Sequence, residues 1–261
     1  MPLLEAGDLK YFQFKSFQNA ALNHGLFTRR GGVSPAPWHS LNVGGTVGDD
    51  PDLVSENLKR VFATLGLARE SAFDVWQVHS AEFVVAEAPR AGEEHVRADI
   101  IMTETPGVSL FMRFADCVPI FLYDPRRHAI GLVHAGWLGT VRQAARVAVE
   151  GMRLHLGSQP EDLVAGIGPA IGQDHYEVGD DVVSAFRESF GWKAERHLRV
   201  ADSHTYLDLA GANEELLRDA GVKNIEQAGI CTACAVQDWF SHRAERGTTG
   251  RFGALFCLNE G

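Results

Sequence analysis

The sequence has few cysteines, no long apolar run and an excess of acidic over basic residues. Four cysteines among 261 residues are too few for a disulfide scaffold, so reduced thiols are expected. No apolar stretch approaches the roughly 18 residues of a membrane-spanning helix. The start, Met1-Pro2-Leu3-Leu4-Glu5, lacks the basic and apolar regions of a secretory signal. These absences predict a cytoplasmic protein without a membrane partner.

The charge balance argues against a nucleic-acid polymer as partner. The chain carries 34 acidic and 24 basic residues, a formal net charge of −10. An acidic surface repels phosphate backbones, although a local arginine cluster can still bind a small anion. A hydrophobic content of 45% is typical of a globular protein with a sizeable core.

Segments with helical and with strand periodicity interleave along the chain, and hairpins occur among them. This mixture predicts an α+β fold rather than a doubly wound parallel sheet. Asp50 and Pro51 are expected to begin a helix, as N-cap and first helical residue. Further helices are expected at 137–152, 180–190 and 208–220, and strands at 163–168, 224–230 and 252–258.

The most informative feature is a β-hairpin with chemically active residues at its open end. Two apolar runs, 117–123 and 128–134, flank the turn cluster Asp124-Pro125-Arg126-Arg127. If these four residues close the hairpin, Cys117 lies opposite His134. Directly opposed residues have Cβ atoms about 4.5–5.5 Å apart. The thiol and the imidazole could then share a metal ion, or one could activate the other.

His79, which ends the short strand-like run 75–79, is a third candidate ligand. Cysteine and histidine suit zinc or copper, and three protein ligands with one open position are typical of catalytic zinc. The alternative is that His79 and His134 are hydrogen-bonded strand-end residues and Cys117 is a small buried hydrophobe.

Two further motifs carry weaker signals. The glycines of Gly166-Ile167-Gly168-Pro169-Ala170-Ile171-Gly172 do not match the spacing of a dinucleotide fingerprint, so a tight supporting turn is expected instead. Cys231-Thr232-Ala233-Cys234 could be a redox or metal half-site, but a buried thiol pair is favoured.

Arginines recur beside small or hydroxyl residues, in Arg29-Arg30-Gly31-Gly32, Ser241-His242-Arg243 and Gly250-Arg251. Guanidinium groups suit bidentate recognition of phosphate or carboxylate. A single arginine of this kind is commonly just solvated, but three such clusters in an acidic chain predict at least one anion contact.

As a set, several motifs carry a resemblance to a known family. They run in order along nearly the whole chain: Phe27-Thr28-Arg29-Arg30-Gly31-Gly32-Val33-Ser34, Leu41-Asn42-Val43-Gly44, Val47-Gly48-Asp49-Asp50, Gln77-Val78-His79, Ala115-Asp116-Cys117, His134-Ala135-Gly136-Trp137, Gly168-Pro169-Ala170-Ile171-Gly172, Ser241-His242-Arg243 and Gly250-Arg251. The chain thereby resembles the YfiH-like laccase-domain family, also called the purine nucleoside phosphorylase, polyphenol oxidase or peptidoglycan editing factor family.

The resemblance implies a single layered domain of α/β/β/α type over residues 1–261, with mixed sheets. It implies catalytic zinc, with copper as the other candidate metal, held by His79, Cys117 and His134. Asp116 would carry a proton or orient a ligand histidine. Candidate substrate-binding residues from the matching motifs are Arg29, Asn42, Gln77, Arg243 and Arg251.

The activity implied is phosphorolysis of adenosine, inosine, guanosine or methylthioadenosine, together with adenosine deamination. The partners would then be a small nucleoside and phosphate. One alternative is an amidase that removes wrong amino acids from UDP-muramoyl precursors. Another is a copper-dependent polyphenol oxidase. Multicopper oxidases bind copper largely through H-x-H pairs, and this chain has none among its 11 histidines.

The chain departs from the family pattern at two positions. Leu138 stands where the family usually has arginine, so one cation that could hold phosphate is missing. His175 stands where a cysteine often precedes Tyr-Glu-Val, and it could reach the site or face solvent.

Overall fold

The structure is a computed structural model that describes residues 3–18, 21–92 and 94–259. From the sequence, no secretory signal is expected in the segment that starts at Met1. The first two residues of that segment, Met1 and Pro2, lie outside the described residues. Within the described ranges, no helix combines the length and the apolar character that crossing a membrane requires.

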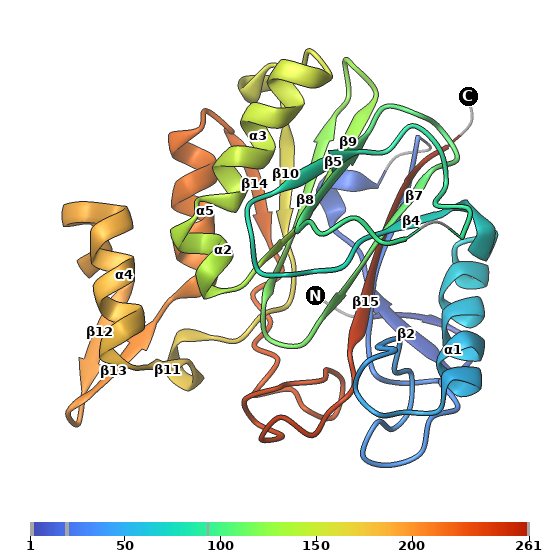
Figure 1. Ribbon diagram of the computed structural model, residues 1–261, viewed down its shortest axis with the longest axis horizontal. Coiled ribbons are helices and arrows are strands. Elements are labelled where there is room, and N and C mark those ends of the chain that lie inside the picture. Colours follow the sequence, from blue (N-terminus) through green and yellow to red (C-terminus); the bar gives the residue numbers. More distant parts are fainter. Residues whose placement is uncertain (1–2, 19–20, 93, 260–261) are drawn as a thin grey trace.

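Two six-stranded mixed sheets form the centre of the molecule (Figure 1). The first has the order β1 (Leu4–Ala6), β2 (Leu9–Phe12), β3 (Leu22–Phe27), β15 (Phe252–Leu258), β7 (Ser109–Phe114) and β4 (Ala72–Asp74). The second has the order β14 (Asn224–Gln227), β10 (Val164–Ile167), β8 (Val118–Asp124), β9 (Ala129–Ala135), β6 (Ile100–Thr103) and β5 (Phe83–Val85).

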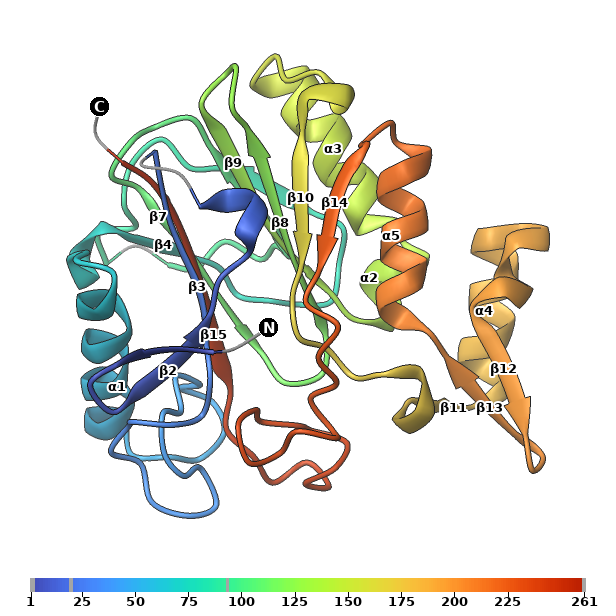
Figure 2. The same ribbon diagram turned by 180° about the vertical axis from the view of Figure 1, so that it is seen from behind.

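The sheets pack face to face, with helices on both outer faces (Figures 1 and 2). α1 (Pro51–Thr64) covers the first sheet, whereas α2 (Trp137–Val141), α3 (Ala144–His155) and α5 (Leu209–Asp219) cover the second. Both faces of a sheet are buried in this arrangement, as the alternation of side chains along β7 shows. Leu110 and Met112 point into the core between the sheets, and Phe111 points toward α1. The expected α+β class and layered architecture are confirmed.

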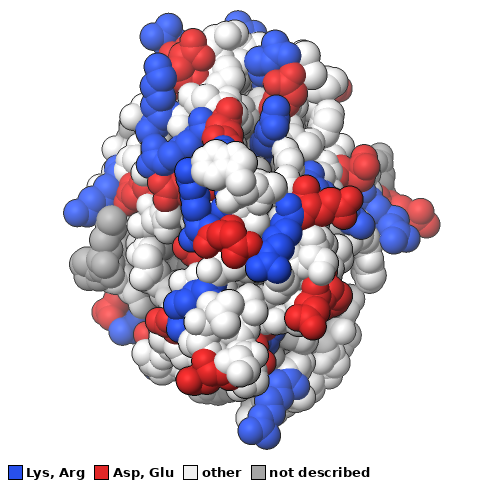
Figure 3. Space-filling view, turned by 90° about the vertical axis from the view of Figure 1, so that its left-hand side faces the viewer, with Lys and Arg blue, Asp and Glu red and all other residues white. Residues whose placement is uncertain are grey.

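α4 (Asp180–Phe190) and a small sheet of β11 (Glu177–Val178), β13 (His204–Leu207) and β12 (Leu198–Ala201) lie at one side of the layers (Figure 1). Basic and acidic side chains are intermixed over the face that carries α4 (Figure 3). Ion pairs such as Arg187 with Glu195 and Arg196 with Glu215 account for part of this mixture.

Several predicted elements are confirmed because their local signals are strong. α1 begins as expected, with the Asp50 side chain accepting a hydrogen bond from the Asp52 amide. α4 and β15 have the predicted bounds. The prediction of one continuous helix over 137–152 is wrong, because the segment forms two helices, α2 and α3. Gln143, which separates them, has a left-handed backbone with a φ of 60°.

The hairpin forms, but its register differs from the prediction by two residues. Pro119, not Cys117, pairs with His134, and Asp124 pairs with Ala129. The cause is the Asp124 side chain, which accepts hydrogen bonds from the amides of Arg126 and Arg127. Asp124 therefore caps the turn while its own backbone stays in the strand.

Candidate functional site

His79, Cys117 and His134 converge although the predicted register is wrong. One ligand atom from each lies within 4.8 Å of the others. The register error is an even number of residues, so the side chains stay on the expected face. His134 lies near the end of β9, and Cys117 lies in the bend between β7 and β8, where the chain crosses from one sheet to the other.

The sequence suggested that His79 ends a strand, but in the structure His79 lies in a loop. β4 ends at Asp74, and beyond it an isolated bridge joins Trp76 to Arg97. His79 itself has a φ of 58°, and Asp116, the neighbour of Cys117, has a φ of 83°. Left-handed backbone is uncommon outside glycine, and here it turns two of the three candidate ligands toward one point.

Asp99, which the sequence analysis missed, ties the two histidines together. Its Oδ1 accepts a hydrogen bond from Nδ1 of His134 at 2.8 Å. Its Oδ2 accepts from the Val78 amide at 3.1 Å, the Ser80 amide at 2.6 Å and the Ser80 hydroxyl at 2.8 Å. Because Asp99 engages Nδ1 of His134, the other ring nitrogen, Nε2, is left to face a metal or a substrate. The same buried carboxylate fixes the loop that carries His79. Its position directly before the apolar strand 100–103 was the available signal.

The protonation states favour a nucleophilic or metal-binding sulfur. Burial opposes ionisation of Cys117, but His134 and His79 outweigh it and lower the pKa of the thiol to about 6. Burial also opposes protonation of His134, but Cys117 and Asp99 outweigh it and raise the pKa of the imidazole to about 9. The pKa of Asp99 falls to about 2, because His134 and Ser80 outweigh the effect of burial. Both shifts favour the charged pair, a Cys117 thiolate beside a His134 imidazolium.

Close packing of the backbone at Gly136 brings the candidate ligands Cys117 and His79 together. A Cβ atom on Gly136 would lie 2.8 Å from Sγ of Cys117 and 3.1 Å from Cδ2 of His79. No other amino acid fits there without displacing a candidate ligand. Nearby, Arg142 donates a hydrogen bond to the carbonyl of His79 at 2.9 Å.

The three residues open into a cavity of about 610 Å³, a size typical of small-molecule sites. The remaining lining residues supply cations, aromatic rings and polar groups: Gly44, Gly45, Thr46, Val75, Trp76, Gln77, His95, Arg113, Ala115, Asp116, Tyr176, His242, Arg243 and Arg251. Of these, Gln77, Asp116, Arg243 and Arg251 were expected from the sequence.

The cations of this cavity differ in their partners. Arg113 is paired with the carboxylate of Asp74 at 2.9 Å. Arg243 donates to the Glu177 carbonyl and Arg251 to the carbonyls of Thr249 and Gly250. Among the described residues, no carboxylate forms an ion pair with Arg243 or Arg251, so their charge is available to an anion.

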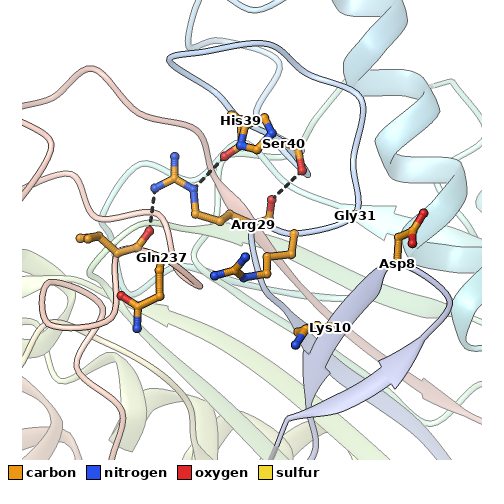
Figure 4. Close-up of a pocket in the computed structure, with 9 residues that line it drawn as sticks. Asp8, Lys10, Arg29, Gly31, His39, Ser40 and Gln237 are labelled. Atoms are coloured by element: carbon orange, nitrogen blue, oxygen red, sulfur yellow. Dashed lines mark hydrogen bonds between the residues drawn. The ribbon is translucent and has the colours of Figure 1, made fainter.

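Arg29 is not brought to this cavity. It lines another one, where its guanidinium donates to the carbonyls of His39 and Val236 (Figure 4) and pairs with Glu245 at 2.9 Å. The candidate substrate-binding residue Arg29 therefore lies apart from the cavity of His79, Cys117 and His134.

Asn42 is buried and does not line the cavity. Its Oδ1 accepts hydrogen bonds from the amides of Gly44 and Arg251, and it thereby positions two residues that do line it. The side chain of Gln77 faces the cavity but is occupied by the backbone of Arg113, with one hydrogen bond in each direction. Leu138, which replaces the family arginine, is not one of the lining residues.

Asp116 does not orient a ligand histidine, since that role falls to Asp99. Its Oδ1 accepts from the Thr232 hydroxyl at 2.7 Å and its Oδ2 from the Arg243 amide at 2.7 Å. The carboxylate therefore links the bend of Cys117 to the loops that carry Thr232 and Arg243.

The second cysteine motif also differs from the prediction. The favoured buried thiol pair is wrong, because Cys234 is exposed and Cys231 is only half-buried. His175, whose position the sequence left open, lies beside both sulfurs rather than in the cavity.

Comparison with known proteins agrees with this architecture. Residues 23–259 match the family described as multi-copper polyphenol oxidoreductase laccase, so the chain belongs to that family. It is 42% identical over 242 residues to a purine nucleoside phosphorylase of Deinococcus radiodurans, covering 92% of this chain and 90% of the relative. It is 37% identical to purine nucleoside phosphorylase YlmD of Geobacillus stearothermophilus, covering 90% of each.

Solved structures show the same fold. The crystal structure of YlmD from Geobacillus stearothermophilus matches with a TM-score of 0.92 at 36% identity, covering 98% of each chain. That of the hypothetical protein YfiH from Bacillus licheniformis matches with a TM-score of 0.90 at 32% identity, covering 99% of each. The family expected from the sequence motifs is thereby confirmed.

Proposed function

We propose that this chain is a zinc-dependent purine nucleoside phosphorylase. The observation that carries the proposal is the single cavity that joins the His79, Cys117 and His134 group to two arginines without a carboxylate partner among the described residues. A nucleoside and phosphate both need to reach one centre, and this cavity has the volume and the cations for both. The names of the Deinococcus and Geobacillus relatives support the same reaction.

The donor set fits a zinc ion. It offers one sulfur whose pKa the neighbouring histidines lower and two imidazoles, of which His134 is held by Asp99 with Nε2 free. Bound there, zinc would supply a Lewis acid that stabilises negative charge developing on a substrate oxygen. Metal binding would displace the His134 proton, since only neutral imidazole is a ligand.

The residues of the chain have separate tasks in this proposal. Arg243 and Arg251 hold phosphate, so that one of its oxygens forms a bond to C1′ of the ribose while the bond from C1′ to the purine nitrogen breaks. The purine leaves with the electron pair of that bond and takes up the proton that the attacking phosphate loses. Trp76 and Tyr176 offer ring faces for the base. Asp116 is a positioning residue, because it holds the Arg243 backbone.

A copper-dependent phenol oxidase is the second candidate, favoured by one observation. Two histidines and one cysteine are also the ligand set of single-copper sites, and the family description names copper. Measured copper content together with oxygen uptake in the presence of a phenol tests this reading.

The decisive assay uses purified protein with inosine, guanosine, adenosine or methylthioadenosine, each with and without phosphate. Free purine and ribose 1-phosphate formed only when phosphate is present support the proposal. Ammonia released from adenosine in the same samples tests the accompanying deamination. Turnover of a UDP-muramoyl amino acid, with no reaction of any nucleoside, would replace the proposal by the amidase alternative.

A further inference from the structure

A second group of metal-ligating side chains lies outside the cavity. It consists of His175, Cys231 and Cys234, whose ligand atoms lie within 4.8 Å of one another. His175 ends a short 3-10 helix, Gln173–His175, and the two cysteines belong to the loop that follows β14. None of the three lines the cavity or contributes to the proposed reaction.

From this arrangement we infer a second zinc site, built by His175, Cys231 and Cys234 and separate from the first. Both sulfurs approach the same nitrogen: Nδ1 of His175 lies 3.6 Å from Sγ of Cys234 and 3.8 Å from Sγ of Cys231. Tetrahedral zinc with its usual bond lengths, about 2.3 Å to sulfur and about 2.05 Å to nitrogen, separates those ligands by about 3.6 Å. Both nitrogen–sulfur distances are thus close to those that one tetrahedral zinc ion requires.

The backbone holds this spacing without help from a metal. The Gly172 amide donates to Sγ of Cys231 at 3.1 Å. A Cβ on Gly172 would lie 3.1 Å from the same sulfur, so the loop approaches as closely as glycine permits. On the other side, the Thr232 amide donates to the Ala170 carbonyl at 3.0 Å, which joins the two loops. Preorganised ligands of this kind lower the cost of binding.

The site lies beside the cavity wall, where a bound metal would join loops rather than take part in the proposed reaction. Thr232, next to Cys231, donates its hydroxyl to Asp116, and Tyr176, next to His175, forms part of the cavity wall. The guanidinium of Arg243 lies over the Tyr176 ring, 5.1 Å from its centroid. A zinc ion joining the loops of His175 and Cys231 would therefore brace the part of the cavity wall that Tyr176 forms.

The test is the zinc content of the whole protein after purification under reducing conditions and dialysis against a weak chelator. Wild type is expected to retain about two equivalents of zinc. Cys234→Ala and His175→Gln, two exposed positions, should each retain about one, and Cys117→Ala should retain the other. The double variant Cys117→Ala with Cys234→Ala should retain none. Cys257→Ala, which removes a thiol from β15, is the matched control and should keep the wild-type content.

Thiol reactivity gives a second readout that does not depend on activity. In the zinc-loaded protein a maleimide should modify Cys234 at least about tenfold more slowly than after zinc is removed by a strong chelator, because the metal-bound thiolate is shielded. Zinc content unchanged in Cys234→Ala and His175→Gln would overturn the inference. So would a wild type with a single zinc that disappears in Cys117→Ala, or one in which Cys231 and Cys234 form a disulfide and bind no metal. Loss of nucleoside turnover alone would affect the proposed function and leave this inference standing.

Discussion

Asp99 accepts a hydrogen bond from His134 at 2.8 Å through one oxygen, while its other oxygen holds the backbone on both sides of His79. Two candidate ligands that lie far apart in the sequence are thus positioned by one buried carboxylate. The geometry of the centre therefore depends on a residue that is not itself a candidate ligand.

Asp99→Asn should weaken the first metal centre without removing a ligand. The amide cannot accept the His134 proton and present acceptors to the His79 loop at the same time. Loss of such a ligand-orienting partner typically costs about 10- to 100-fold in metal affinity. Zinc affinity measured by chelator competition checks this. An affinity equal to that of wild type would show that Asp99 does not orient His134.

Gly136→Ala should displace Cys117 and His79 while the fold persists. The new Cβ would lie 2.8 Å from the Cys117 sulfur, and misplacement of reacting groups by about 1 Å can cost about 100-fold in rate. Gly139→Ala, three residues on and within α2, is the control, because its Cβ would make only ordinary contacts, at 3.4 Å or more. Turnover and melting temperature, measured for both variants, separate a local effect from unfolding. Equal activity of the Gly136→Ala and Gly139→Ala variants would show that the close approach of Gly136 to Cys117 does not position the reacting groups.

Arg243→Ala should raise the KM for phosphate by about 10- to 100-fold, the effect of one charge-assisted hydrogen bond. The KM for the nucleoside should change much less. Arg126→Ala, which removes an exposed arginine in the hairpin turn, should leave both constants unchanged. If the Arg243 variant alters the nucleoside KM alone, phosphate binds elsewhere.

Stability should fall as the pH decreases from about 6.5 to about 4 because of His24. Burial lowers the pKa of this imidazole to about 4, and its Nε2 accepts a hydrogen bond from the Phe14 amide. Above pH 6.5 the imidazole is neutral in both states and stability is complete. Below it the unfolded chain gains a proton that the folded chain does not bind until about pH 4, at a cost of about 3 kcal/mol.

Urea denaturation across this pH range, for wild type and His24→Gln, checks the His24 effect. Glutamine can accept the Phe14 hydrogen bond but does not titrate, so the slope of unfolding free energy against pH should be shallower in the variant. Parallel slopes would assign the pH dependence to other groups.

The sequence predicted elements whose signals are local. The N-cap at Asp50 and the apolar periodicity of 180–190 sufficed for α1 and α4. The hairpin register was not predictable in the same way, because it depends on whether the Asp124 side chain caps the turn from within the strand. The break at Gln143 likewise follows from a single residue with left-handed backbone, which no periodicity reveals.

The sequence predicted the three candidate ligands of the site but not the residues that support them. Cys117, His134 and His79 stand out by residue type and by motif, and the structure brings them together. Their supports did not stand out, since Asp99 and Gly136 act through hydrogen bonding and close approach across segments that are distant in sequence. Arg29 shows the reverse case: its motif is prominent, yet Glu245 and backbone carbonyls hold it in another cavity.

The most direct measurement is a zinc titration of the metal-free protein while phosphorolysis of inosine is followed. Wild type should have no turnover without metal and regain it in proportion to the zinc bound at the first centre. Cys117→Ala should remain inactive at every zinc concentration. Full turnover of inosine by metal-free wild-type protein would contradict the account.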